Sequence, residues 1–306
     1  MEHLIESNDL RLAALMARAS PRIIVPLNED ALKPGATAPS FYCVHAVTGG
    51  GITDFSDLAK EIGPGVRFFA IQAPKKLMIN SDYTQLLKFI VGHYVDAIIT
   101  FQPEGQIHLG GWSAGALVAL EIARQLRAKG RDVGVLVSID GGPKNTRVVG
   151  SSLRYTAKVL RNLPRALLND DFGRLSRRLL FAIKKLLTKA RPKQNNSADI
   201  HPVQGVVKQF SKYPPYQQSF MMALYDEIEG TVFPPYDGTV VVYKAGINPI
   251  RLSGVREFWK RISPNCEVVI VQATHEGLIL IPKVRLLAAD LKRRLIDDTW
   301  LGLERC

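Results

Sequence analysis

The chain has 306 residues, of which 46% are hydrophobic and 22% are charged. This is enough apolar material for one large α/β domain with an insertion, or for two small domains. No apolar run reaches the roughly 18 residues of a membrane span, and the acidic first residues do not fit a secretory signal. The formal net charge of +12 is concentrated in residues 144–193, which hold 14 Lys and Arg against two acidic residues, so the charge belongs to one segment and not to the fold.

The three cysteines, Cys43, Cys266 and Cys306, have neither the spacing of a metal site nor that of a disulfide framework. We expect Cys43 and Cys266 to be buried in or beside apolar strands. A reducing, cytoplasmic location is the default that follows, and no metal or cofactor of the protein's own is expected. The oligomeric state is left open by the sequence.

Short apolar runs alternate with longer helical stretches along the chain. Residues 1–20 have the spacing of an amphipathic leader helix. The predicted strands are 22–27, 41–46, 66–72, 106–110, 133–139, 239–243 and 267–271, and the predicted helices are 55–62, 83–101, 114–129 and 282–294. Strands separated by helices indicate right-handed crossovers, and therefore an α/β fold with a mainly parallel central sheet flanked by helices. We assign residues 21–144 and 237–306 to this core.

The alternation is interrupted over residues 145–236, which we interpret as an inserted helical lid that is strongly basic. Within it, apolar residues recur every three or four positions from Phe172 to Leu186, so 171–189 is predicted to be an amphipathic helix.

The strongest chemical signal is the sequence Gly111-Trp112-Ser113-Ala114-Gly115, a G-x-S-x-G pattern. An apolar strand directly precedes it and an amphipathic helix directly follows it, which is the context of a nucleophile elbow. The serine sits on a sharp turn there, and side chains at either glycine would clash where helix and strand pass closely. The pattern predicts that Ser113 is a nucleophile in an α/β-hydrolase fold.

A serine needs a base to attack a carbonyl near neutral pH. His275 lies in a turn between the last strand and the last helix, where the base approaches the serine in this fold, and it satisfies the chain order serine, acid, histidine. The other histidines are His3 in the leader, His45 at the end of the second strand, His93 in a helix, His108 packed inside a strand and His201 in the lid.

The acid of the predicted triad can follow either of two strands. The strand after the lid is followed by residues 244–251, which contain no carboxylate. Asp140 lies instead at the carboxyl end of the strand 133–139, beside the elbow strand, at the edge where ligands bind in such sheets. We therefore predict that Asp140 holds the imidazole tautomer and stabilises the imidazolium; the alternative is that it only caps a turn with Gly141 and Gly142.

An oxyanion hole requires two backbone N–H groups aimed at the developing charge. The residue after the nucleophile, Ala114, supplies one. The loop 45–51 after the second strand supplies the other, with Ala46 as our choice and Val47 second. The glycines of this loop do not form a dinucleotide or phosphate loop, since no G-x-G-x-x-G or lysine-bearing pattern is present.

Taken together, the stretches IIVPLN, FYCVHAVTGG, GGWSAGALVALEIARQL, SIDGG, YDGTVVVY and THEGLILIP resemble the thioesterase domains that release products from nonribosomal peptide and polyketide synthases. They span residues 23–291 apart from the lid. The resemblance implies a helical lid over an acyl channel, and an acid on the earlier strand, as with Asp140. It also implies that Ser113 takes an acyl chain from the phosphopantetheine arm of an acyl or peptidyl carrier protein, and that water or a nucleophile in the substrate releases it.

Two features depart from that family. The chain has no G-x-D-S-L carrier motif, so it either acts in trans or is a piece of a larger synthase. The lid is also unusually basic, and either steers an acidic carrier protein or is simply a solvated helix face. Membrane-surface binding is a weaker third reading, and nucleic-acid binding is not expected, because aromatic residues are few in the basic segment.

The triad itself leaves several reactions open. The leading hypothesis is a thioesterase that hydrolyses or cyclises its product. A lipase or esterase of oxygen esters, an acyltransferase to an amine or alcohol, and a catalytically silent scaffold are the alternatives. The intact set of Ser113, Asp140 and His275 argues against the last.

Overall fold

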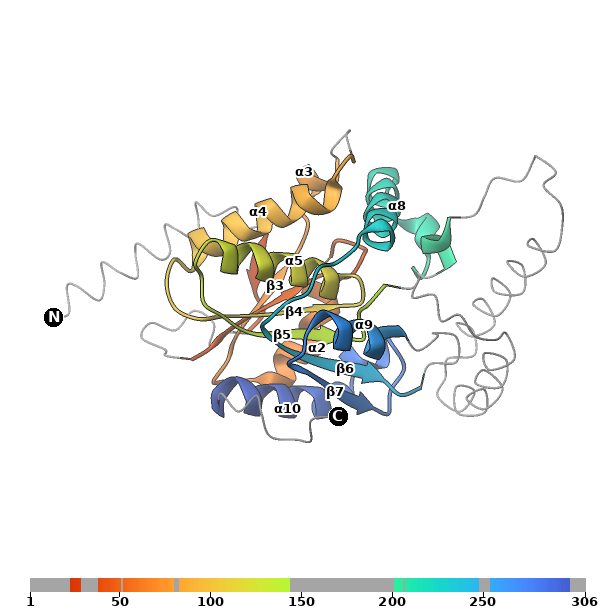
Figure 1. Cartoon of the computed structure of the whole chain (residues 1–306). Helices are drawn as coiled ribbons and strands as arrows, with labels where there is room; N and C mark the ends of the chain where they lie inside the picture. Colours follow the sequence, from red (N-terminus) through yellow and green to blue (C-terminus); the bar gives the residue numbers. More distant parts are fainter. Residues whose placement is uncertain are drawn as a thin grey trace, which may run out of the picture.

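The computed structural model describes residues 23–28, 38–50, 52–79, 83–143, 201–205, 207–247 and 254–297. Seven strands form one sheet in the order β1-β3-β2-β4-β5-β6-β7 (Figure 1). Only β1, at one edge, runs antiparallel to its neighbour β3; the other described pairs are parallel. The strands are β1 Ile24–Pro26, β2 Ser40–Val44, β3 Arg67–Ile71, β4 Ile107–Trp112, β5 Val133–Ile139, β6 Thr239–Ala245 and β7 Cys266–Val271.

The helices of the described residues cover both faces of the sheet. They are α2 Ile52–Ile62, α3 Lys75–Met78, α4 Leu86–Phe101, α5 Gly115–Ala128, α8 Pro215–Gly230, α9 Gly254–Ile262 and α10 Val284–Asp297, with short 3₁₀ turns η2 Pro202–Gly205, η3 Phe210–Lys212 and η4 Gly277–Ile279. Every strand and helix predicted between residues 21 and 306 outside the lid is present, with ends shifted by at most three residues. The predicted α/β fold with a mainly parallel sheet is therefore confirmed.

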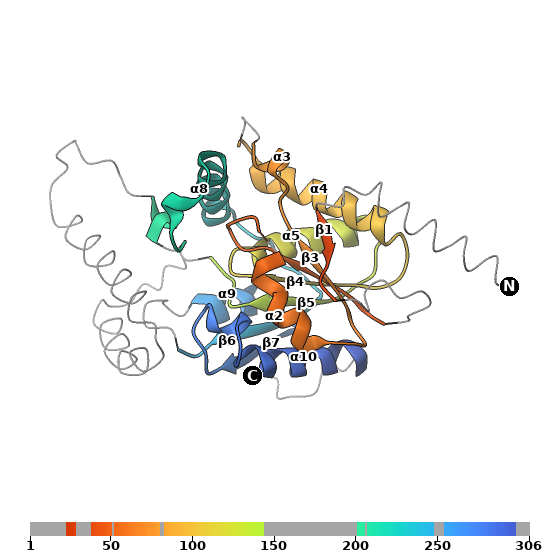
Figure 2. The same cartoon turned by 180° about the vertical axis from the view of Figure 1, so that it is seen from behind.

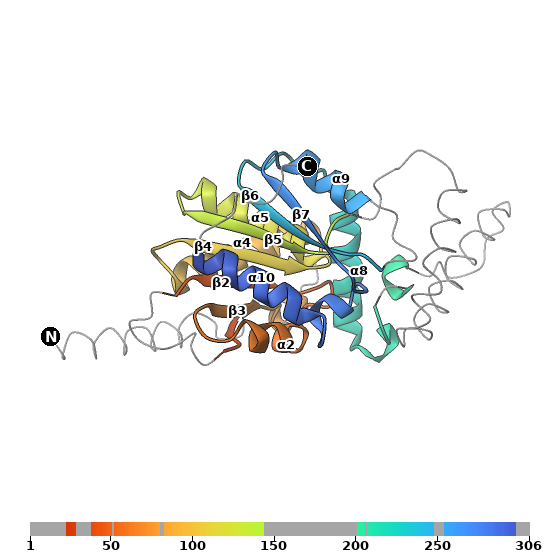
Figure 3. The ribbon, with the colours of Figure 1, turned by 90° about the horizontal axis from the view of Figure 1, so that it is seen from below.

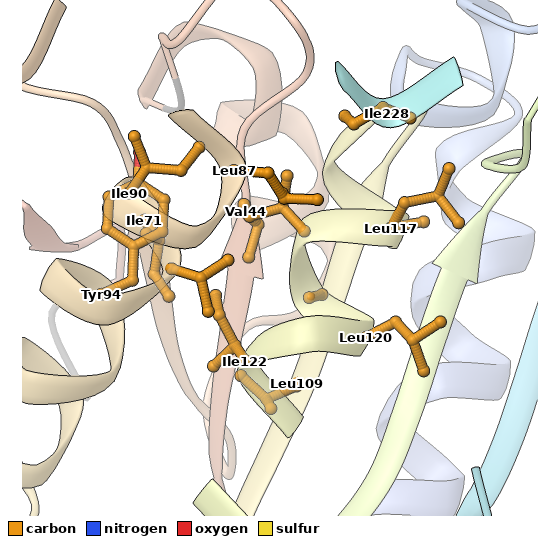
Figure 4. Close-up of a cluster of buried hydrophobic side chains, with 14 of the residues drawn as sticks. Val44, Ile71, Leu87, Ile90, Tyr94, Leu109, Leu117, Leu120, Ile122 and Ile228 are labelled. Atoms are coloured by element: carbon orange, nitrogen blue, oxygen red, sulfur yellow. The ribbon is translucent and has the colours of Figure 1, made fainter. Parts of the chain in front are cut away.

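Two apolar layers enclose the sheet because strand side chains alternate between its faces. Phe69 and Ile71 of β3 belong to the larger layer, with α4, α5, α8 and α9, whereas Phe68 and Ala70 belong to the other, with α2 and α10. Figures 1 and 2 show these two helical layers from opposite sides. Figure 4 shows part of the larger layer, in which side chains of α4 meet those of α5 and of the strands: Leu87, Ile90, Tyr94, Ile122, Val44 and Ile71.

The connection between β5 and β6 contains the insertion, which we interpret as a lid. Its described part, residues 201–205 and 207–236, forms η2, η3 and α8, whereas the predicted helix 171–189 and the leader 1–20 lie outside the described residues. Figure 3 shows α8 at the end of the sheet where β6 and β7 finish. The described part of the insertion is thus next to the carboxyl ends of the parallel strands.

The sequence analysis did not predict α8 and α9, although both carry a signal. Proline stands at the first position of α8, which is its preferred place in a helix. In α9, the buried residues Val255, Phe258, Trp259 and Ile262 have the spacing of one helix face.

The two cysteines within the described residues differ in burial. Cys43 is fully buried in β2, as predicted. Cys266 is only half-buried, so that prediction was wrong, because β7 is the edge strand and its first five residues keep part of their surface. Cys306 lies outside the described residues. Over the described ranges, no helix combines the length and the apolar character needed to cross a membrane.

Candidate active site

Ser113 sits at a sharp turn between β4 and α5. Its φ of 57° is in the left-handed region, which L-residues adopt at a cost of order 1–3 kcal/mol when the surroundings enforce it. The Ser113 N–H donates to the carbonyl of Ile139 at 3.0 Å, which fixes the turn to the end of β5. The predicted strand–turn–helix context of the G-x-S-x-G pattern is therefore confirmed.

The two glycines of the pattern are required by close backbone contacts. A Cβ added at Gly111 would overlap the backbone of Gly115, and a Cβ added at Gly115 would overlap the carbonyl of His45 at the end of β2. Any larger residue would therefore push α5 away from the sheet. The clash predicted for both positions is confirmed.

Asp140 directly follows β5, and the residue is 1% exposed. Its N–H donates to the Tyr243 carbonyl at 2.8 Å, and its Oδ1 accepts from the Ala245 N–H at 3.2 Å, so the end of β6 holds it on two sides. The next residue, Gly141, packs so closely that a Cβ there would overlap Ala116 and the Ser113 carbonyl. Asp140 is therefore fixed beside the elbow, as predicted.

His275 lies between β7 and η4 and is 8% exposed. Its Nδ1 is 2.7 Å from Asp140 Oδ2, which joins two residues 135 positions apart. A carboxylate can only accept, so Nδ1 carries the proton in this bond and the Nε2 atom of the neutral ring is the basic one. The structure thus brings together the predicted base and the predicted acid.

Trp112, inside the G-x-S-x-G pattern, supports the histidine, a role that the sequence analysis did not assign. Its indole N–H donates to the His275 carbonyl at 3.2 Å, and its ring stacks on the imidazole with centroids 5.3 Å apart. The residue before the nucleophile therefore orients the loop that carries the base.

The predicted oxyanion donors lie at the ends of β2 and β4. Ala114 is the residue before the first turn of α5 and has helical backbone angles. Ala46 and Val47 are buried in the loop after β2. Among the described residues, none accepts a hydrogen bond from the N–H of Ala46, Val47 or Ala114. These are therefore backbone donors with spare capacity near the elbow.

His45 is enclosed beneath this loop and is fully buried. Its Nδ1 lies 2.5 Å from the Ala46 carbonyl and its Nε2 lies 2.6 Å from the Tyr94 hydroxyl. The carbonyl must accept, so Nδ1 donates and Nε2 accepts from tyrosine. Burial, partly offset by the bond to Ala46, lowers the pKa of His45 to about 4. A ring with both nitrogens engaged cannot serve as the base.

The remaining described histidines have local partners. His108 Nδ1 accepts from the Val135 N–H at 3.3 Å and is buried in the sheet, as predicted. His93 Nδ1 lies 2.9 Å from the Phe89 carbonyl on α4. His201 pairs with Asp226 of α8 at 3.0 Å. Within the described ranges, no group of three His, Cys, Asp or Glu side chains is arranged to hold a metal ion.

Comparisons with known proteins show the family to which this chain belongs. The profile of the thioesterase domain family matches residues 39–212, more than half of the chain. The chain is 33% identical over 135 residues to the chondramide synthase of Chondromyces crocatus and 31% identical over 114 residues to a dimodular nonribosomal peptide synthase of Bacillus subtilis (strain 168). The matches cover 44% and 37% of this chain, but only 3% and 5% of those much longer relatives.

The crystal structure of the NocB thioesterase domain from the nocardicin cluster has the same fold. It superposes with a TM-score of 0.57 at 21% identity, covering 89% of this chain and 98% of that domain. At this identity the likeness shows the fold alone. The family match, the shared fold and the elbow with its neighbouring histidine–aspartate pair lead to one conclusion: the chain belongs to the thioesterase domain family.

Proposed function

We propose that this protein releases an acyl, peptidyl or polyketide chain from the phosphopantetheine thioester of a carrier protein, through an acyl-Ser113 intermediate. The observation that carries the proposal is the 2.7 Å bond between His275 and Asp140, buried beside the strained Ser113 turn. The membership in the thioesterase family and the synthases among the relatives support the carrier-bound substrate.

In the first half of the proposed reaction, Ser113 Oγ attacks the thioester carbonyl and its proton passes to His275 Nε2. Asp140 holds the ring tautomer and stabilises the imidazolium. The tetrahedral intermediate then expels the pantetheine sulfur, which takes the proton from His275. In the second half, water or a nucleophile of the substrate attacks the acyl-serine with the same base, and Ser113 is regenerated.

We assign the oxyanion hole to the N–H of Ala114 and to one N–H of the loop after β2. The His45 carbonyl is turned towards Gly115 at the start of α5, and the N–H of Ala46, in the same trans peptide, therefore points the opposite way. This orientation favours Val47 over Ala46 as the second donor. The two donors, Ala114 and Val47, remain predictions, which a transition-state analogue bound at Ser113 would test.

The partner and the setting are part of the same proposal. The insertion over residues 145–236 acts as the lid, and its basic segment 144–193 attracts an acidic carrier protein, either in trans or within a parent synthase. The thiols of Cys43 and Cys266 are free, which supports a reducing, cytoplasmic compartment. The reaction needs no cofactor beyond the pantetheine that the partner carries.

The test is the intact mass of the protein after mixing with an acylated carrier protein. We expect the acyl mass on the wild type and no adduct on Ser113→Ala. The released product then separates hydrolysis or cyclisation from transfer to an added amine or alcohol. Failure to form an adduct or to release product, together with rapid cleavage of free oxygen esters, would overturn the proposal in favour of an esterase.

A further inference from the structure

The insertion contacts the loop after β2 directly, through α8. Gln217, in the first turn of α8, donates from Nε2 to the Thr48 carbonyl at 2.8 Å across 169 residues of sequence. One turn later, Phe220 is fully buried against the same loop, with its ring centroid 6.4 Å from that of His45. A Cβ at Gly49 would lie 3.2 Å from the Phe220 ring. The helix α8 therefore contacts the loop both through the hydrogen bond of Gln217 and through the buried ring of Phe220.

The bond from Gln217 is the first in a chain of peptide groups. The Thr48 carbonyl shares a peptide plane with the Gly49 N–H, which donates to the Ala46 carbonyl at 3.1 Å. The Ala46 carbonyl in turn shares a plane with the Val47 N–H, the favoured oxyanion donor. Each peptide is rigid and trans, so fixing its carbonyl fixes the direction of its N–H. Hydrogen bonds in such a series also polarise one another.

The other bonds of this loop come from the core. His45 Nδ1 also donates to the Ala46 carbonyl, and the Ala73 N–H donates to the Gly49 carbonyl at 2.8 Å. Among the described residues, the Thr48 carbonyl has Gln217 as its partner, so this one link in the loop depends on the insertion.

The place of α8 is itself fixed by a bond to the core. The Glu227 carboxylate accepts from the Leu87 N–H at 2.7 Å, in the first turn of α4. That helix has no side-chain cap of its own and no acidic residue in its first turn. Glu227 thus caps α4 from a different helix, and the bond holds α8 in the register that lets Gln217 reach Thr48.

We propose that Gln217 is a positioning residue that sets the direction of the Val47 N–H through the Thr48 and Ala46 carbonyls. The inference rests on the proposed function, because it assigns Gln217 a role in the same oxyanion hole. It makes the geometry of the insertion a condition for stabilising the tetrahedral intermediate.

The experiment compares Gln217→Ala and Gln217→Glu with the matched variant Gln218→Ala. Gln218 is the neighbouring glutamine on α8, and its Nε2 donates to the Tyr213 carbonyl at 2.7 Å within the insertion. We expect kcat of both Gln217 variants to fall about ten- to a hundredfold, because a misplaced oxyanion donor weakens transition-state binding. KM and the melting temperature stay near those of Gln218→Ala. The substrates are an acetyl thioester and a long-chain acyl thioester of N-acetylcysteamine.

The two substrates separate positioning from direct substrate contact. A positioning role lowers kcat equally for both acyl groups. An effect on KM only, or on the long chain only, would mean that Gln217 lines the acyl channel, and it would overturn the inference. Equal behaviour of Gln217→Ala and Gln218→Ala would overturn it as well.

A measurement without turnover separates this inference from the proposed function. The backbone amide ¹⁵N and ¹H shifts of Val47 and Gly49 are recorded in wild type, Gln217→Ala and Gln218→Ala. We expect both amides to move in Gln217→Ala and neither to move in Gln218→Ala. Unmoved amides would refute the relay even in an active enzyme, whereas moved amides in an enzyme without thioesterase activity would refute the proposed function and leave the relay standing.

Discussion

Two histidine–aspartate pairs occur in the described part of the chain, one at the elbow and one in the insertion. His275 and Asp140 are 9% and 2% exposed at the side chain, whereas His201 and Asp226 are 18% and 65% exposed. The first pair joins loops at the ends of β7 and β5, and the second joins the start of η2 to α8. Both have hydrogen-bond distances, 2.7 and 3.0 Å.

The two pairs differ in which ring nitrogen they use. His275 uses Nδ1 to donate a hydrogen bond to Asp140, which leaves Nε2 as the basic atom. His201 uses Nε2 to bind Asp226, and its Nδ1 accepts a hydrogen bond from the Val203 N–H at 3.2 Å. Proximity of a carboxylate is therefore not enough to make a base: the ring must also keep a lone pair for the nucleophile. Variants of the two pairs test this comparison at the base and at the acid, and the pH dependence of stability tests a third histidine, His45.

The largest expected effect is on the base. His275→Ala should lower kcat for a thioester by roughly 10⁶-fold, because nothing then accepts the Ser113 proton. His201→Ala should leave kcat within about twofold. Steady-state kinetics of both variants, each with an unchanged circular dichroism spectrum, checks this. A large loss of kcat in His201→Ala would show that the second pair also takes part in turnover.

The second-largest expected effect on kcat is that of the acid, Asp140. Asp140→Asn removes the carboxylate that selects the Nδ1–H tautomer, and we expect kcat to fall roughly 10⁴-fold. Asp226→Asn, at the exposed pair, should stay within about twofold of wild type. The same thioester assay measures both. If Asp140→Asn keeps nearly the full rate, Asp140 is a turn-capping residue and the acid lies elsewhere.

The smallest effect concerns stability and His45. Its pKa of about 4 lies below the ordinary value of 6.5, so the unfolded chain binds a proton first and stability falls as the pH drops from 6.5 to 4. Burial raises the pKa of Asp54 from 3.8 to about 6, which has the opposite sign and offsets the loss over much of that window. When the pH is lowered from 6.5 to 4, the unfolding free energy of Asp54→Asn should therefore fall by up to about 3 kcal/mol more than that of the wild type, because the variant lacks the offset from Asp54.

Urea titrations of wild type and Asp54→Asn at pH 4, 5, 6 and 7 measure this difference. Parallel pH profiles of the two proteins would contradict the opposing roles of His45 and Asp54. A wild-type profile that is nearly flat, beside a steep one for the variant, is the expected result.

Much of the site could be predicted because the signals are local. The elbow is five consecutive residues between a strand and a helix, and Asp140 and His275 each follow a predicted strand, so the parallel sheet brings them to one edge. The burial of Cys266 was predicted wrongly, since whether a strand is at an edge depends on strand order. The helix α8 was missed in the same way, because its partners α3 and α4 are distant in sequence.

The amino-acid sequence by itself determined the alternation of strands and helices, the strained serine turn and the family to which the chain is similar. Each of these rests on short-range patterns: apolar periodicity, glycines at a close approach, and residue order. Tertiary structure alone decided which nitrogen of each histidine is engaged, that Trp112 supports His275, and that Gln217 reaches Thr48. The last two are contacts across more than 160 residues, and the geometry of all three depends on how several elements pack together, which no local pattern encodes.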